Sequence, residues 1–598
     1  MSPAIRCSGG PWLGDVRVDH PVTRRDIVRG GGAIITLATS AACLNRAFAA
    51  DRIPTIATGV VFEDRSGNGE RAPLDPGIAG VLVSNGREVV KTDAQGRYAL
   101  PVEDGDIIFV IKPTGYAVPI ESGTMLPRFY YIHQPEGTPA QLALRHRGVA
   151  PSGPLPDSID FALRKASEPT RFDVLLFTDT HAGSDAEIDF IRDDVVTPLV
   201  GTPAAFGITT GDIASDDLSL YARYNRIVAQ LGVPWHNIVG NHDLNLDAPD
   251  GRYSRETFKR TFGPTYYAFE YGGALFLMLD NVEYFGARPR RAGEDCGYRG
   301  RFGERQLAFV ANVLNETPAD RLVVAAMHIP LATYLDPDDP ASNTADRAAF
   351  IKLLGNRPSI SFSGHTHTTE HHYLSGADDD PGGTLHHHHV MTAVSGSWWS
   401  GPYDHRGVAV ADSHDGTPNG FHVLSVDGNR ATTRYRPAKE PNARQVRTLL
   451  EPAQVAAPAS RDAGGCGVAA KDFMSALNGS PIAQDSVGST DLVVNVFDGG
   501  PRTSVEYRIG ARAAVRMEPR RRQDPFVKEV FARNRSTKKS WVKAEPCSHL
   551  WVARLPADLE AGTHCIRVQV TDEYGRAHHD HLVLEVVARQ AASALAPP

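Results

Sequence analysis

The strongest constraint on the fold is a series of apolar runs between residues 170 and 440, each of which ends in a polar residue. The runs read VLLFTDTH, AAFGITTGD, PWHNIVGNHD, LVVAAMH and SISFSGHTH. Short, uninterrupted apolar runs are typical of strands that are buried on both faces. Because helical patterns lie between them, we predict an α/β domain over residues 168–440.

One of these helical patterns is well marked. Ser184 and Glu187 form a capping box, and apolar residues follow at helical spacing: Ile188, Ile191, Val195, Val196 and Leu199. Further helices are expected at residues 216–231, 304–316 and 344–354.

The polar residues at the ends of the apolar runs should meet, because side chains at the carboxyl ends of neighbouring strands converge on one edge of a sheet. Within Asp-x-His and His-x-His, the i, i+2 spacing points both side chains the same way if the backbone is extended. We therefore predict that one cavity holds seven of them: Asp179, His181, Asp212, Asn241, His328, His365 and His367.

These seven side chains suit a pair of metal ions. Carboxylate, amide and imidazole groups without a thiolate favour Mn, Fe, Zn or Co, and seven ligands exceed what one ion needs. Two divalent or trivalent ions about 3.5–4 Å apart generate a bridging hydroxide near neutral pH and hold the oxygens of a phosphoryl group. Each residue alone is more simply a hydrogen-bonded polar group, but the set together predicts a hydrolytic site for phosphate esters.

The ordered series D-x-H, G-D, G-N-H-D, H and G-H-x-H resembles that of the calcineurin-like metallophosphoesterase superfamily, from Asp179 to His367. The resemblance implies two packed mixed β-sheets flanked by helices. It also implies one metal bound by Asp179, His181, Asp212 and His367, and a second bound by Asp212, Asn241, His328 and His365, so that Asp212 bridges them.

The resemblance assigns roles to two further residues. His242 would contact the phosphate beside Asn241 and protonate the leaving oxygen after attack by the bridging hydroxide, and Asp243 would orient the His242 ring. Trp398 and Trp399, in SGSWWSGP, are candidates for the wall of a substrate cleft, although packing against a neighbouring sheet or domain is an alternative.

Both flanks of the α/β segment read as all-β. Residues 51–150 and 481–590 contain short β-branched runs between turn residues, which predicts a β-sandwich at each end. Residues 441–480 lose this periodicity and are predicted to be a linker. The three-part layout resembles a bacterial exported subgroup of the superfamily. Within the α/β segment, His386 to His389 would alternate between the two faces of a strand.

The first 50 residues are interpreted as an export signal. Arg24-Arg25 precedes a short apolar stretch and an Ala-x-Ala pattern at residues 47–49, which resembles a twin-arginine signal. Such cargo crosses the membrane folded, so we expect a periplasmic or secreted protein without a membrane span in the mature chain; an uncleaved anchor is the alternative. After cleavage, Cys547 and Cys565 could form a disulfide or stay free.

The net charge of −8 gives no long-range attraction for nucleic acid. No Arg or Lys cluster stands beside the motifs to neutralise a terminal dianion, which favours phosphodiesters, as small molecules or envelope polymers. Phosphomonoesters and diphosphates remain alternatives. A competing class is a non-catalytic envelope module that binds glycan or protein, but such a module needs no complete ligand set.

Overall fold

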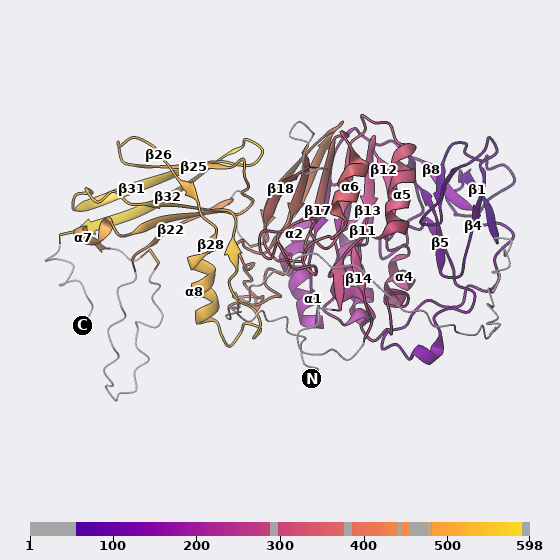
Figure 1. The fold of residues 1–598 in the computed structure, drawn as a ribbon, viewed down its shortest axis with the longest axis horizontal. Helices are drawn as coiled ribbons and strands as arrows, with labels where there is room; N and C mark the ends of the chain where they lie inside the picture. Colours follow the sequence, from indigo (N-terminus) through magenta and orange to yellow (C-terminus); the bar gives the residue numbers. More distant parts are fainter. Residues whose placement is uncertain are drawn as a thin grey trace, which may run out of the picture. The chain divides into compact units, whose positions relative to one another are not determined.

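The computed structural model describes residues 55–287, 297–375, 385–439, 444–453, 477–478 and 481–588. The predicted export signal lies outside these residues. Figure 1 shows β-rich segments before and after a central part that contains most of the helices. In the described part of the chain, no helix is long and apolar enough to cross a membrane.

The central part contains two mixed β-sheets, as predicted. The five-stranded sheet has the order β11-β10-β9-β20-β21, in which β9, β10 and β11 are parallel. Its strands are β9 (Arg171–Phe177), β10 (Phe206–Thr209), β11 (Trp235–Asn237), β20 (Gly420–Asp427) and β21 (Arg430–Pro437).

The six-stranded sheet has the order β12-β13-β16-β17-β19-β18, with antiparallel strands at its two edges. A separate hairpin consists of β14 (Val282–Tyr284) and β15 (Tyr298–Gly300). The strands of the sheet are β12 (Tyr267–Tyr271), β13 (Ala274–Met278), β16 (Val323–Ala326), β17 (Ser359–Ser363), β18 (Glu370–Leu374) and β19 (His386–Val390).

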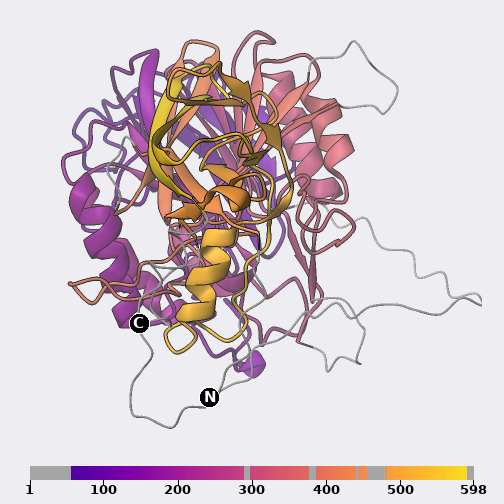
Figure 2. The same ribbon diagram turned by 90° about the vertical axis from the view of Figure 1, so that its left-hand side faces the viewer.

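Apolar side chains fill the space between the two sheets. The rings of Phe206 and Phe276, one from each sheet, lie 5.1 Å apart in an edge-to-face contact. Each fully buried side chain of this size contributes about 1.5–3 kcal/mol by leaving water. Figure 2 shows helices on opposite sides of the pair of sheets. These helices are α1 (Asp185–Ile191), α2 (Thr197–Leu199), α3 (Tyr221–Val228), α4 (Glu256–Phe262), α5 (Glu304–Asn315) and α6 (Arg347–Leu354).

The capping box predicted for the first helix is partly formed. The Ser184 hydroxyl accepts a hydrogen bond from the Glu187 backbone N–H, as expected for an N-cap. The Glu187 carboxylate, however, accepts from the N–H of Gly183 and pairs with Lys539, whose Nζ lies 2.8 Å away. The helices expected at residues 216–231, 304–316 and 344–354 are also present, as α3, α5 and α6, and α3 and α6 begin later than predicted.

The N-terminal β-structure consists of two four-stranded sheets, β4-β1-β8-β6 and β3-β2-β5-β7. It extends past residue 150, because β8 pairs in parallel with β1 across a hundred residues of sequence. Its strands are β1 (Ile56–Glu63), β2 (Leu82–Ser84), β3 (Val89–Lys91), β4 (Arg97–Pro101), β5 (Asp106–Ile111), β6 (Tyr116–Ala117), β7 (Tyr130–His133) and β8 (Phe161–Lys165).

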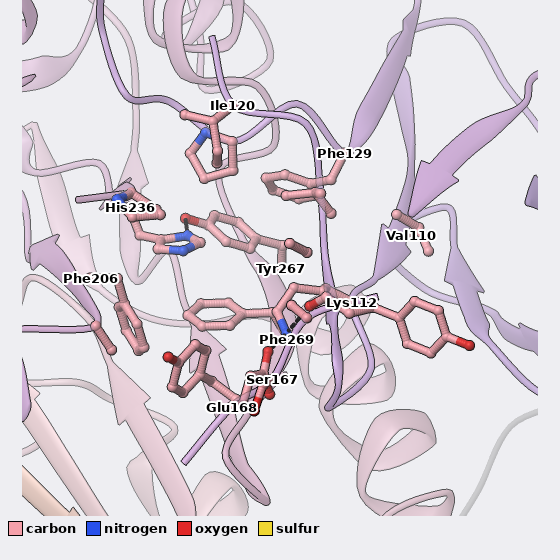
Figure 3. A pocket seen from close by; sticks show the side chains of 18 residues that line it. Val110, Lys112, Ile120, Phe129, Ser167, Glu168, Phe206, His236, Tyr267 and Phe269 are labelled. Atoms are coloured by element: carbon pink, nitrogen blue, oxygen red, sulfur yellow. Dashed lines mark hydrogen bonds and ion pairs between the residues drawn. The ribbon is translucent and has the colours of Figure 1, made fainter. Parts of the chain in front are cut away.

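A cavity of about 140 Å³ lies where these sheets meet the central part (Figure 3). It is mostly apolar, with His236 stacked on Phe269 at 4.1 Å and a buried ion pair of 2.6 Å between Lys112 and Glu168 at one side. None of the seven predicted metal ligands is among the described residues that line it.

The C-terminal β-structure also has two sheets, β22-β24-β30-β27 and β23-β32-β31-β25-β26, and a small pair, β28-β29. The linker prediction was too long, because β22 lies within residues 441–480 and pairs with β24. The elements are β22 (Val446–Glu451), β23 (Ile482–Ala483), α7 (Gln484–Val487), β24 (Asp491–Val496), β25 (Ser504–Ile509), β26 (Val515–Arg516), β27 (Glu518–Pro519), β28 (Arg522–Gln523), α8 (Pro525–Arg533), β29 (Pro546–Cys547), β30 (Leu550–Arg554), β31 (Gly562–Thr571) and β32 (Ala577–Val587). Cys547 and Cys565 are free thiols.

Candidate metal centre

The seven predicted ligands follow the carboxyl ends of five strands, as the sequence suggested. Asp179 and His181 follow β9, and Asp212, Asn241 and His328 follow β10, β11 and β16 respectively. His365 and His367 follow β17. Six of the seven side chains are buried, and His365 is half-buried. The two packed sheets therefore bring together residues that are far apart in the sequence.

The backbone at these residues differs from the extended conformation that we expected. Five of the seven have positive φ angles, between 44° and 76°: Asp179, His181, Asp212, His365 and His367. Residues other than glycine rarely adopt this left-handed conformation, which costs about 1–3 kcal/mol each and is concentrated at functional sites. The ligands therefore lie on tight turns just beyond the strands, and these turns rather than strand alternation direct them inward.

One group of ligands contains Asp179, His181 and His367. The Nε2 atoms of the two histidines lie 3.0 Å apart, and both lie 3.4–3.6 Å from Asp179 Oδ1. His181 Nε2 is also 3.5 Å from Asp212 Oδ2. The donor atoms of Asp179, His181 and His367 thus lie close enough together to hold one ion, with Asp212 beside them.

A second group adjoins the first. His328 Nε2 lies 2.9 Å from Asn241 Oδ1, 3.2 Å from His365 Nδ1 and 3.3 Å from Asp212 Oδ2. Asp212 Oδ2 is therefore close to a histidine of each group. This is the position that a bridging carboxylate requires.

The ring tautomers fit a metal. His328 Nδ1 donates to the Thr210 carbonyl at 2.9 Å, and His367 Nδ1 donates to the Gly396 carbonyl. Each of these bonds fixes the proton on Nδ1 and leaves the lone pair of Nε2 directed into the site.

The charges of the site also favour cations. Burial opposes ionisation of Asp179, but hydrogen bonds from His181 and His367 hold its pKa well below the usual range. The pKa of Asp212 is lowered in the same sense, mainly by His328 and His242 against the effect of burial. Burial lowers the pKa of His328, but the Asp212 charge outweighs it and raises this pKa to about 9. Both carboxylates therefore keep their negative charge, which suits a site that holds metal cations.

Two glycines allow the close approach of the ligand loops. A Cβ atom on Gly364 would lie 2.0 Å from Asp179 Oδ2, and one on Gly240 would lie 2.1 Å from Asp212 Oδ1. Any side chain at either position would displace a carboxylate. This explains the glycine before the ligand in G-N-H-D and G-H-x-H.

His242 lies beside the two ligand groups, and its side chain is one-third exposed. Its backbone N–H donates to Asp212 Oδ1, and its Nδ1 lies 2.7 Å from Asp216 Oδ1. Our expectation that Asp243 orients this ring is corrected, because Asp216 occupies that position. The sequence did not reveal Asp216, which stands in a loop at positive φ and belongs to no motif.

Asp243 instead stabilises the loops that carry the ligands. Its buried carboxylate accepts hydrogen bonds from the backbone N–H groups of Ile213, Ala214 and Gly240, and from the Tyr221 hydroxyl. It therefore joins the loop that carries Asp212 to the one that carries Asn241.

The two tryptophans have different positions. Trp398 stacks on His367, with ring centroids 3.9 Å apart, and is partly exposed. Trp399 is only 3 % exposed and packs in the core, and its indole N–H donates to the Thr180 carbonyl. The prediction that Trp399 walls a cleft is therefore wrong, whereas Trp398 lies beside the centre.

Three family models match consecutive parts of the chain. They describe the N-terminal part of calcineurin-like phosphoesterases (residues 66–145), the calcineurin-like phosphoesterase itself (172–369) and its C-terminal part (388–578). The chain belongs to the calcineurin-like phosphoesterase family. It is a metal-dependent phosphoric ester hydrolase, and the central match contains all seven candidate ligands.

Solved structures that resemble this phosphoesterase include a purple acid phosphatase from yellow lupin (Lupinus luteus) seeds and a dimetal phosphatase from Danio rerio. The first is 13% identical and covers 60% of this chain and 68% of its own, with a TM-score of 0.31. The second is 14% identical and covers 44% of this chain and 99% of its own, with a TM-score of 0.30. No curated protein matches this phosphoesterase.

Proposed function

We propose that this phosphoesterase is an exported enzyme that hydrolyses phosphodiesters with His242 as its general acid. The observation that carries the proposal is the position of His242 beside Asp212, the carboxylate shared by both ligand groups. When bound, two metal ions would activate a water molecule and hold the phosphoryl oxygens.

The contacts of His242 support its role as an acid. Asp216 pairs with Nδ1, which leaves Nε2 available to give its proton to the leaving oxygen. The backbone bond to Asp212 holds the residue at the edge of the ligand groups. The exposure of the ring gives a substrate access to it.

Two observations favour diesters. Among the described residues, no Lys or Arg forms an ion pair with Asp179 or Asp212, so the protein itself offers no strong extra charge for a terminal dianion. Trp398 offers an apolar surface beside His367 that suits a second ester group.

The test compares bis-p-nitrophenyl phosphate with p-nitrophenyl phosphate, using protein reconstituted with Mn²⁺ beside the Asp212→Asn variant. We expect faster turnover of the diester and loss of turnover in the variant. Faster turnover of the monoester would reverse the proposed preference. If metal-loaded protein hydrolyses neither ester, the substrate would instead contain a diphosphate bond. If the protein binds no metal, the result would support an envelope-binding module.

Export is proposed from the sequence of the first 50 residues. The test is to replace Arg24 and Arg25 by lysine in the full chain and to measure the enzyme in the periplasm and the cytoplasm of a bacterium that has a twin-arginine pathway. Retention of the variant in the cytoplasm is expected, and unchanged export would contradict the proposal.

A further inference from the structure

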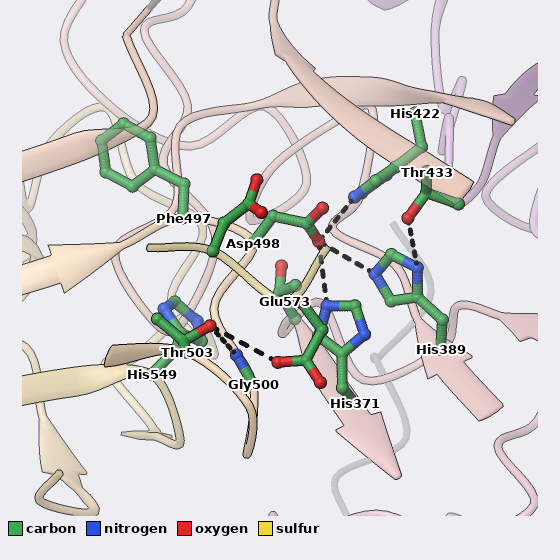
Figure 4. A network of polar contacts seen from close by, with 12 residues as sticks. His371, His389, His422, Thr433, Phe497, Asp498, Gly500, Thr503, His549 and Glu573 are labelled. Carbon is green, nitrogen blue, oxygen red and sulfur yellow. Dashed lines mark hydrogen bonds and ion pairs between the residues drawn. The ribbon is translucent and has the colours of Figure 1, made fainter. Parts of the chain in front are cut away.

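A second histidine cluster lies away from the ligands described above. His371 on β18, His389 on β19 and His422 on β20 surround Asp498, which follows strand β24 of the C-terminal part (Figure 4). All four side chains are buried. The cluster shares no residue with the dinuclear ligand set.

All three rings direct Nε2 toward the same carboxylate oxygen. The distances to Asp498 Oδ1 are 3.3 Å from His371, 3.0 Å from His389 and 3.2 Å from His422. When nitrogen and oxygen ligands surround a tetrahedral zinc at about 2.0–2.1 Å, neighbouring donor atoms lie about 3.3 Å apart. The three separations from Asp498 Oδ1 are close to that value, and the donor atoms of His371, His389 and Asp498 all lie within 4.8 Å of one another.

Hydrogen bonds alone do not satisfy this cluster. His371 and His422 occupy the two lone pairs of Asp498 Oδ1. His389 Nε2 and Asp498 Oδ2 are buried without any hydrogen-bond partner in the described part of the protein. An unpaired buried polar atom costs about 1–3 kcal/mol, and this cluster has at least two. A cation among the four side chains would satisfy both.

The outer ring nitrogens prepare two of the histidines for such a cation. His389 Nδ1 contacts Thr433 Oγ1 at 3.4 Å, and that hydroxyl is 2.8 Å from the Tyr574 hydroxyl. His371 Nδ1 lies 3.0 Å from His387 Nε2. Contacts of this kind at Nδ1 orient metal-binding histidines and leave the Nε2 lone pair free.

We propose that His371, His389 and Asp498 bind a third metal ion, Zn²⁺, with the ring of His422 beside them, and that this ion joins the C-terminal β-structure to the central part. Because His371, His389, Asp498 and the adjoining His422 are all buried, the site leaves no open position for a substrate, as in a structural rather than a catalytic zinc site. Its ligands come from the six-stranded sheet and the C-terminal part, and His422 comes from the five-stranded sheet. The ion would therefore stabilise the assembly without entering the reaction.

The experiment counts zinc in the purified full-length chain after saturation with Zn²⁺ and removal of excess metal. We expect about three ions per chain in the wild type and about two in His389→Gln, with diesterase activity retained. The matched control is His386→Gln, in the same strand and equally buried, whose ring contacts Ser359 and Ser361 instead. This control should keep about three ions.

A zinc count that is equal in the wild type and His389→Gln would overturn the proposal. If that variant does not fold, Asp212→Asn provides a second test, because the dinuclear ligands are then impaired while the cluster is intact. Titration of this variant with Co²⁺ should still give the visible absorption of a four-coordinate ion, and absence of that absorption would also overturn the proposal.

Discussion

Among individual residues, the pairing of His242 with Asp216 has the clearest consequence for catalysis. Burial lowers the pKa of His242, but the charges of Asp212 and Asp216 outweigh it and raise the pKa to about 9. A general acid must carry its proton, so activity should fall as the pH rises through this pKa.

We expect Asp216→Asn to lower kcat by about 10- to 100-fold, because the ring loses its charged partner. The pKa of His242 falls in the variant, so the alkaline limb of the kcat profile should move to lower pH while metal content is unchanged. Asp217→Asn is the matched control, since its carboxylate contacts Ser219 instead. An unchanged alkaline limb in Asp216→Asn would exclude this role.

Gly364 gives a second prediction at this scale. In Gly364→Ala, the new methyl group would lie 1.8 Å from Thr178 Oγ1 and 2.0 Å from Asp179 Oδ2, so the carboxylate must move. Overpacking of this kind costs about 1–3 kcal/mol. We expect metal content and kcat to fall together, as measured by elemental analysis and diester turnover. A variant with full metal content and full rate would show that the loop adjusts without disturbing Asp179.

Among the elements, helix α1 begins four residues after His181 and so supports the first ligand loop. Ser184→Ala removes its N-cap, which should cost about 1 kcal/mol. The amide protons of α1 should then exchange about fivefold faster, measured by hydrogen exchange, while those of α5 stay unchanged. Equal exchange of α1 in both proteins would mean that tertiary contacts alone hold the helix.

The sequence predicted the elements that depend on local patterns and failed where distant segments pair. The apolar runs and the Ser184 cap are local signals, and both appear in the structure. Strands β8 and β22 lie outside the predicted sandwiches because each is defined by a partner elsewhere in the chain. The turns at the ligands and the position of Asp216 depend on contacts between loops, which periodicity does not encode.

At the scale of the whole molecule, the C-terminal part reaches the surroundings of the centre. Trp541 is 47% exposed, and its ring lies 6.4 Å from that of Trp398, which stacks on His367. Trp541→Ala should raise the KM for an aryl diester about 2- to 10-fold and leave kcat nearly unchanged. Val515→Ala, which changes another exposed apolar residue of this part, is the control. Equal KM values in the two variants would show that Trp541 does not contact the substrate.

Metal removal should affect the whole molecule as well as the reaction. A chelator should abolish diester turnover and lower the midpoint of thermal unfolding, because an ion that binds only the folded chain stabilises it. Addition of Mn²⁺ or Zn²⁺ should restore the midpoint. An unchanged midpoint in calorimetry would mean that the ligand loops hold their conformation without ions.

The dinuclear ligands follow five different strands, from Asp179 to His367. No short piece of the chain holds a complete set, so the centre can exist only after both sheets have assembled. In the folded export that we propose, metal binding would precede transport across the membrane. The identity of the bound metal would then depend on the ions available in the compartment where the chain folds. It would not depend on the ions in the compartment where the enzyme acts.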